Sequence, residues 1–173
     1  MRNSLLMLLC FMMAWPLMAD QVGLKQGTFS QEKHFKGFTK PFISEGLFKL
    51  TEQGLIWQVE SPIKSKLVIK QGQVYTYNER GEAQLQKGAE PYVALLQAII
   101  KHDKAALALQ FNTREHADND CQLLLPNDEM LQQIFSQFTV CADEKNVNSV
   151  RLQEINGNVT LLRFSYPQDG SPQ

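Results

Sequence analysis

Short apolar-rich runs separated by tight turns dominate residues 28–86, and this pattern restricts the possible folds more than any other feature of the sequence. The runs lie at residues 27–34, 43–50, 55–60, 65–70, 73–78 and 83–86. Gly54, Gly72 and Gly81 mark the clearest turns between them. Short strands joined by short turns pair with their neighbours in sequence, so the pattern predicts an antiparallel meander.

The stretch GLFKLTEQGLIWQVESP, residues 46–62, shows what kind of sheet this is. Apolar residues occupy both the odd and the even positions of its two runs. Because successive side chains of a strand point to opposite faces, neither face of this hairpin is wholly polar. The sequence therefore predicts a sheet that is apolar on one side and partly covered on the other.

A helical pattern follows the meander. Pro91 precedes the apolar segment 92–100, and proline is favoured at the first position of a helix. Gln97 is nearly the only polar residue in this segment. Such a helix must be covered on several sides, or must face something apolar that is not protein.

A second group of elements completes the chain. We expect strands at residues 107–114, 121–125, 138–142, 149–155 and 159–166, and a short amphipathic helix at 128–138 with Asn127 or Asp128 as its N-cap. The turn Asn156-Gly157-Asn158 indicates a hairpin between the last two strands. No internal repeat and no long linker is present, which predicts a single domain.

The first nineteen residues have the layout of a cleavable signal peptide. A charged start precedes the uncharged apolar segment 5–15, and Ala19 stands before Asp20. The alternative is an uncleaved anchor, but a membrane span needs about 20 apolar residues. We expect export with cleavage near Ala19-Asp20, which leaves residues 20–173 as one domain with a mobile tail at 167–173.

Cleavage would remove Cys10 and leave two cysteines, Cys121 and Cys141. An even number of cysteines in an exported protein predicts a disulfide, and two buried free thiols are the alternative.

The composition argues against several classes of function. The formal net charge is −1, whereas a protein that binds nucleic acid needs a basic face. His34, His102 and His116 lack the spacing of a metal site, and no nucleophile, phosphate-binding or dinucleotide motif is present. We expect a protein that is not an enzyme, has no metal or cofactor, binds no nucleic acid and is a monomer.

Aromatic residues in successive strands carry the most information about a binding site. Phe29, Phe48, Trp57 and Tyr75 belong to four different predicted strands, and the apolar helix follows directly. One interpretation is an ordinary core between a sheet and a helix. The other is a curved sheet whose concave side the helix fills only in part, which leaves an apolar pocket.

A family resemblance favours the second interpretation. Phe29-Ser30-Gln31, Ser44-Glu45-Gly46-Leu47-Phe48, Leu55-Ile56-Trp57 and Pro62 resemble motifs of the periplasmic outer-membrane lipoprotein carriers, the LolA-like family. The resemblance covers roughly residues 24–166 and is closest to a divergent branch of that family. It implies a mainly β fold with some α: an incomplete antiparallel β-barrel whose open, concave side is covered by helices.

The resemblance also implies a function. It indicates a periplasmic protein that carries an acyl chain, lipid or lipoprotein from an inner-membrane donor complex to an outer-membrane receptor. The alternative is an accessory or scaffold protein of an envelope assembly that uses the same fold. From the family position of Trp57 and the strand period we expect a cavity lined by ten residues. They are Phe29, Phe48, Leu50, Leu55, Trp57, Val59, Tyr75, Val93, Leu96 and Ile100.

The sequence departs from the family at two points. Thr51 and Glu52 stand where the standard carrier has Arg and Pro. The predicted mature chain also leaves little room for the amphipathic helix with which the family begins. We therefore expect a cargo other than the standard outer-membrane lipoproteins.

Overall fold

The computed structural model describes residues 25–52, 54–78 and 80–167 of the 173-residue chain. The predicted signal peptide, its cleavage site and most of the predicted tail lie outside the described residues.

One antiparallel sheet of 11 strands forms the body of the described chain and does not close into a barrel. The strand order is β6-β5-β4-β3-β2-β1-β11-β10-β9-β8-β7. The strands are β1 (Gln26–His34), β2 (Phe42–Thr51), β3 (Gly54–Ser61), β4 (Ser65–Lys70), β5 (Gln73–Tyr77), β6 (Ala83–Leu85), β7 (Phe111–Glu115), β8 (Cys121–Pro126), β9 (Phe135–Ala142), β10 (Val147–Glu154) and β11 (Val159–Ser165). The expected half-barrel fold is confirmed.

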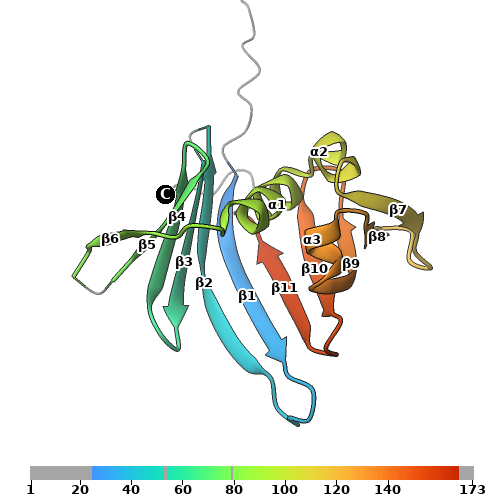
Figure 1. Ribbon diagram of the computed structural model, residues 1–173, viewed down its shortest axis with the longest axis horizontal. Coiled ribbons are helices and arrows are strands. Elements are labelled where there is room, and N and C mark those ends of the chain that lie inside the picture. Colours follow the sequence, from blue (N-terminus) through green and yellow to red (C-terminus); the bar gives the residue numbers. More distant parts are fainter. Residues whose placement is uncertain (1–24, 53, 79, 168–173) are drawn as a thin grey trace, which may run out of the picture.

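The sheet has two wings that meet at β1. We call β2 to β6 the N-terminal wing and β7 to β11 the C-terminal wing. The chain runs through the N-terminal wing as the predicted meander, and β11 returns to pair with β1 from Thr28↔Ser165 to His34↔Val159. The sheet curves so that its concave side faces the helices (Figure 1).

Helix α1 (Glu90–Lys101) lies across the concave side, as its apolar sequence predicts, and contacts β5 of one wing and β10 of the other. Its proline stands in the first turn, where a missing N–H costs nothing. Val93, Leu95 and Ile99 are among its buried residues. The helix ends at His102, whose left-handed backbone donates its N–H to the Ile99 and Ala98 carbonyls.

Two predicted elements are wrong in part. Residues 107–114 do not form one strand, because Asp103 accepts a hydrogen bond from the Ala106 N–H and caps the short helix α2 (Lys104–Ala108) before β7 begins. The predicted helix 128–138 shrinks to α3 (Glu129–Gln132), capped by Asp128 through the Leu131 N–H. Beyond it the Ile134 carbonyl accepts from the Ile155 N–H, which draws the chain into the sheet as β9.

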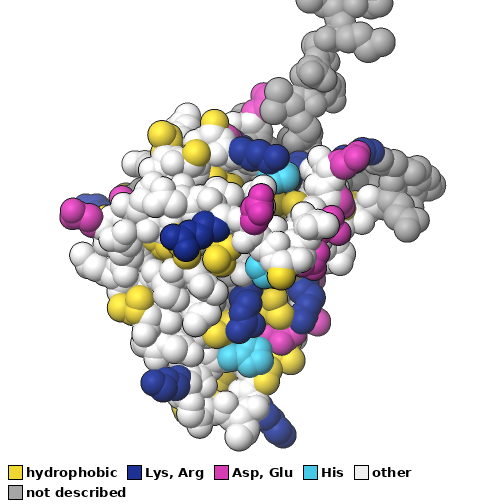
Figure 2. All heavy atoms as spheres, turned by 90° about the vertical axis from the view of Figure 1, so that its right-hand side faces the viewer, with side chains coloured by type: hydrophobic (Ala, Val, Ile, Leu, Met, Phe, Trp, Pro, Cys, Tyr) yellow, Lys and Arg dark blue, Asp and Glu magenta, His cyan; other side chains and the backbone are white. Residues whose placement is uncertain are grey.

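The described surface carries charges of both signs. Seen from the side of the C-terminal wing, Lys and Arg lie beside Asp and Glu rather than forming a field of one sign (Figure 2). No helix in residues 25–52, 54–78 and 80–167 is long and apolar enough to cross a membrane.

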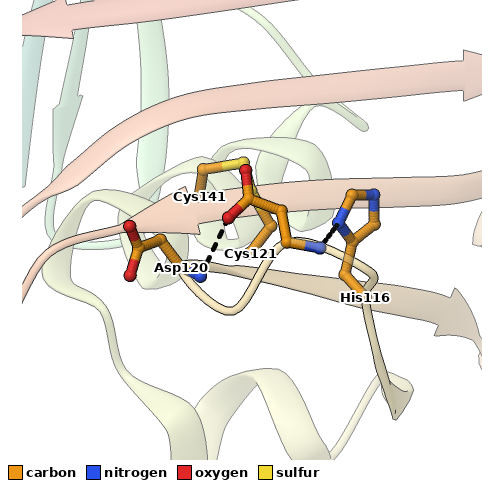
Figure 3. The surroundings of a disulfide bond; sticks show 5 residues. His116, Asp120, Cys121 and Cys141 are labelled. Atoms are coloured by element: carbon orange, nitrogen blue, oxygen red, sulfur yellow. Dashed lines mark hydrogen bonds between the residues drawn. A yellow bond between two sulfur atoms is a disulfide. The ribbon is translucent and has the colours of Figure 1, made fainter.

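The predicted disulfide is confirmed. Cys121 and Cys141 are direct partners in the pairing of β8 with β9, with their Cα atoms 4.0 Å apart (Figure 3). The loop before Cys121 is ordered by its own hydrogen bonds, from the Asp118 N–H to His116 Nδ1 and from the Asp120 N–H to Asp118 Oδ1. The bond thus joins two neighbouring strands of the C-terminal wing.

Candidate ligand-binding cavity

An apolar cavity of about 210 Å³ lies between α1 and the concave face of the sheet. The side chains that line it come from α1, β1, β11, β10 and β9. They are Gln31, Leu95, Leu96, Ile99, Phe135, Phe138, Val150, Leu152, Thr160 and Leu162. Because eight of these ten are apolar, the cavity suits a hydrocarbon group.

Strand register places these side chains on one face. Val150 of β10 pairs with Leu162 of β11, and Leu152 pairs with Phe138 of β9. Directly opposed residues of antiparallel strands project to the same side, so all four face α1. From the helix, Leu95, Leu96 and Ile99 complete the wall.

Aromatic rings pack against one another on the inner face of the sheet between the N-terminal wing, β1 and β11. Phe29 and Trp57 stack with their ring centroids 3.7 Å apart. Phe48 meets Phe164 edge-to-face at 5.4 Å and Tyr166 at 5.5 Å. In the same wing, the residues Leu50, Leu55, Ile69 and Val74 are also buried. This half of the concave side is therefore packed core.

Tyr166 joins this core with its hydroxyl donating to the Val147 carbonyl at 3.0 Å. Burial, and to a lesser degree the negative charge of Asp143, raises the pKa of Tyr166 to about 12. The phenol is thus a neutral structural donor.

The structure brings only part of the expected ligand site together around the cavity. Leu96 lines it. Phe29, Phe48, Leu50, Leu55, Trp57, Val59, Val93 and Ile100 belong to, or pack against, the hydrophobic core on the inner side of the sheet. Tyr75 lies on the outer face, because it pairs with Val68 while its neighbour Val74 is the buried, inward residue.

Sequence reasoning missed the strand residues that line the cavity, including Phe138, Val150 and Leu152. The available signal was the alternation in the last three strands, which gives Val150 and Leu152 the same face. That alternation identifies inward positions, but it does not show which of them border empty space.

An ion pair adjoins the cavity at its end near the β1–β2 turn. Lys33 and Glu154 form this pair on the inner side of the sheet, and Lys33 is the strand partner of Thr160, which lines the cavity. Burial works to raise the pKa of Glu154, but hydrogen bonds from Lys33, Asn158 and Asn156 outweigh it and hold the pKa below its usual range. Glu154 is therefore a carboxylate at neutral pH.

A larger hollow of about 920 Å³ lies beside the disulfide, but its lining is mixed. Its walls include His102, Lys104, Asp118, Asp120 and Asp143. A hydrocarbon placed there would strip water from charged groups without replacing their hydrogen bonds. The smaller apolar cavity is therefore the better site for an acyl chain. Among the described residues, no group of three or more His, Cys, Asp or Glu side chains is placed to hold a metal ion.

An open antiparallel half-barrel with an apolar cavity beneath a covering helix defines a fold of the lipoprotein-carrier type. The chain belongs to this family: the family model "Outer membrane lipoprotein carrier protein LolA" matches residues 21–172. The resemblance seen in the sequence is thereby confirmed. No curated protein is significantly similar in sequence to the chain.

The chain is also distantly similar to several solved structures. A LolA superfamily protein from Nitrosomonas europaea is 7% identical with a TM-score of 0.43, over 87% of this chain and 89% of that one. The MucA/MucB complex structure of Pseudomonas aeruginosa gives 16% identity and a TM-score of 0.44, over 84% of this chain and 53% of that one. A DUF1329 family protein from Desulfovibrio piger is 9% identical with a TM-score of 0.43, over 88% of this chain and 89% of that one. These likenesses are too distant to say what this chain binds.

Proposed function

We propose that this chain is a periplasmic carrier that binds the acyl chain of a lipid or lipoprotein and moves it between the inner and outer membranes. The observation that carries the proposal is the cavity under α1, in which eight of ten lining side chains are apolar. Membership of the LolA family supports the same function and implies an inner-membrane donor and an outer-membrane receptor as partners.

Such a carrier works without a catalytic group. Each CH₂ group left exposed to water costs about 0.8 kcal/mol, and an apolar cavity removes that cost while the cargo crosses an aqueous compartment. The protein contributes shape and exclusion of water, and no bond is made or broken.

Loading requires α1 to move. The cavity of about 210 Å³ is smaller than the roughly 300–1,000 Å³ of pockets that enclose drug-sized ligands. Helix α1 forms one wall through Leu95, Leu96 and Ile99. Moving this wall outward enlarges the cavity without unpairing a strand, so α1 acts as the lid. Cargo then shifts the balance between a closed and an open position of the lid.

The experiment compares two glutamate substitutions on α1. Leu96 is half-buried and lines the cavity, whereas Ala94 is exposed on the same helix. In Leu96→Glu, a charge lies where the acyl chain binds, so the affinity for a fluorescent fatty-acid analogue should fall at least about tenfold. Ala94→Glu adds the same charge on the outside and should bind as the unmodified protein does.

Equal binding by folded Leu96→Glu and Ala94→Glu would reject the cavity as the acyl site. Solvent extraction and mass spectrometry of the protein purified from the periplasm test the carrier function itself. Co-purified lipid supports a carrier, while its absence together with unmeasurable fatty-acid binding supports the scaffold function.

We also propose that the cargo is not the standard set of outer-membrane lipoproteins. Thr51 stands where the standard carrier has Arg, and its hydroxyl donates to the Gly54 carbonyl at 3.2 Å within the β2–β3 turn. A neutral hydroxyl used in this way cannot supply the charge or the five donors of a guanidinium. Expression in cells depleted of their own carrier should therefore fail to restore lipoprotein sorting, and full rescue would refute this cargo assignment.

Export is part of the same proposal. N-terminal sequencing of the protein from the periplasmic fraction should begin at or near Asp20. An intact Met1 in the membrane fraction would show an anchored protein instead.

A further inference from the structure

Exposed apolar side chains gather at one end of the half-barrel. In the described part of the chain ten large hydrophobic residues are exposed, and six of them are at or beside the three turns β1–β2, β3–β4 and β10–β11. These are Phe35, Phe38, Phe42, Ile43, Ile63 and Ile155. The three turns lie at the same, lower end of the sheet in Figure 1. We call this the distal end.

The most prominent part of the distal end is the tip of the β1–β2 hairpin, residues 35–43. Phe38 and Phe42 are 68% and 61% exposed, although both are among the most hydrophobic side chains. Their rings and that of Phe35 form a mutual edge-to-face cluster, with centroids 5.4 to 6.5 Å apart. The cluster gives the rings a fixed arrangement while leaving their outer edges in water.

The tip is also held to its neighbour. The Phe38 N–H donates to the Phe35 carbonyl at 3.0 Å, which closes a tight turn. The Lys36 N–H donates to Asn158 Oδ1 at 3.0 Å, which ties the tip to the β10–β11 turn. Asn158 in turn donates to Glu154, the carboxylate paired with Lys33. The exposed rings are therefore presented by an ordered scaffold.

The turns of the distal end carry basic charge only, whereas the strand ends beside them also carry Glu32, Glu60 and Glu154. Residues 33–43, 62–64 and 155–158 contain four lysines and no Asp or Glu, although the whole chain has a net charge of −1. The lysines are Lys33, Lys36, Lys40 and Lys64. Lys33 is neutralised by Glu154, which leaves the lysines of the two turns to set the potential. Figure 2 shows hydrophobic and basic side chains side by side towards this end.

We propose that the distal end docks on an anionic lipid bilayer, with Phe38 and Phe42 in the headgroup–acyl boundary and Lys36 and Lys40 at the level of the lipid phosphates. Apolar side chains at the tips of separate turns can enter a bilayer surface together, and lysine stems extend along them towards the headgroups. An anionic surface attracts this end specifically, because basic residues gather there in a chain of slightly negative net charge.

Docking in this orientation would bring the cavity close to the membrane. Gln31 of β1 lines the cavity, and Lys33 and then the tip follow it along the chain. Lys33 pairs with Glu154 at the end of β10, beside the β10–β11 turn. The inference extends the proposed function but does not depend on it, because vesicle binding is measured without any cargo.

The test is flotation of the purified protein with vesicles of phosphatidylethanolamine and phosphatidylglycerol, and with vesicles of phosphatidylcholine alone. The protein should float with the anionic vesicles and much less with the neutral ones. Phe38→Ser/Phe42→Ser should reduce the binding constant at least about tenfold. Lys36→Gln/Lys40→Gln should reduce it about 25-fold at low salt, since each lysine near an anionic surface contributes about fivefold.

The matched control is Leu109→Ser/Met130→Ser. These two side chains are 81% and 48% exposed but lie outside the distal end, so this variant should bind as the unmodified protein does. As a second readout, the fluorescence emission of Phe38→Trp should shift to the blue when anionic vesicles are added. The emission of the unmodified protein should shift less under the same conditions. No binding to anionic vesicles, or an equal loss in the control variant, would overturn the proposal and leave a protein partner as the occupant of this surface.

Discussion

The two wings of the sheet share one concave side but fill it in opposite ways. Under the N-terminal wing, the stacked and edge-to-face rings of Phe29, Phe48 and Trp57 leave packed core. Under the C-terminal wing, Val150 and Leu152 together with the rings of Phe135 and Phe138 border a cavity of about 210 Å³ beneath α1. The same strand architecture thus provides a packed half and a hollow half.

The difference follows from how the rings are arranged: Phe29, Phe48 and Trp57 interlock with one another, whereas Phe135 and Phe138 share the cavity wall with aliphatic side chains. Flat rings bury a large area and interlock in few arrangements, which favours a dense, stable core. Aliphatic side chains opposite a helix can leave a gap, at the cost of the dispersion contacts that its walls lose. In the proposed carrier, the packed half would hold the sheet together while the hollow half would receive the hydrocarbon.

The largest expected effect comes from removing a ring of the packed half. Phe48 is 2% exposed and contacts Trp57, Phe164 and Tyr166. Phe48→Ala should lower the free energy of unfolding by about 3–5 kcal/mol in urea titrations at neutral pH. Leu152→Ala in the hollow half should lower it by about 2 kcal/mol or less, because this half-buried side chain already borders a cavity. Equal losses would show that the two wings are packed alike.

The disulfide gives the next largest effect, and it belongs to the hollow half. Cys121 and Cys141 close a loop with a sequence separation of 20 residues, for which chain-entropy arguments give about 3 kcal/mol. Cys121→Ser/Cys141→Ser should therefore lower the free energy of unfolding by about this amount. Thiol titration of the denatured, non-reduced protein should find no free thiol, and two reactive thiols would remove the basis of this expectation.

A larger side chain at an inward position should have different effects on stability in the two wings. Leu152→Phe adds volume into the cavity, so it should leave stability unchanged or raise it by up to about 1 kcal/mol while fatty-acid binding falls about tenfold. Leu55→Phe makes the same change in the packed half, where Leu55 is fully buried, and overpacking should lower stability by about 1–3 kcal/mol. If Leu152→Phe were as destabilising as Leu55→Phe, the cavity would be too small to accept a ring.

The sequence predicted the sheet well because its evidence is local. Alternation and turns define each strand, and Cys121 and Cys141 form the expected disulfide. The errors arose where a local pattern had two solutions. Leu131, Phe135 and Phe138 have helical spacing, but the sheet recruits the last two as β9.

The position of the cavity could not be predicted in the same way. Inward-facing residues of both wings look equally apolar in sequence, and the free space depends on where α1 lies over the sheet. It also depends on how the rings of Phe29 and Trp57 stack, which is a property of the assembled core. Of the three α1 residues expected at the cavity, Val93, Leu96 and Ile100, the structure places Leu96 in its lining.

The smallest expected effect concerns His102, at the end of the helix that spans both wings. Burial holds its pKa below the ordinary value of 6.5, and the positive charges of Lys104 and Lys25 add to this, while Asp143 opposes it. The folded protein therefore binds a proton less readily than the unfolded chain does. Stability from the neutral imidazole is present above pH 6.5 and is lost as the pH falls from 6.5 to the lower folded pKa.

His102→Asn removes this titration and keeps a residue that tolerates the left-handed backbone, here with φ of 57°. Urea unfolding between about pH 7 and pH 5, where histidine titrates, should show a shallower loss of stability in the variant. Glu32 and Glu154 have pKa values below the ordinary 4.5, so both carboxylates titrate in more acidic solution than this range. Their titration therefore does not obscure the comparison. An identical pH profile in both proteins would mean that protonation of His102 does not weaken the end of α1.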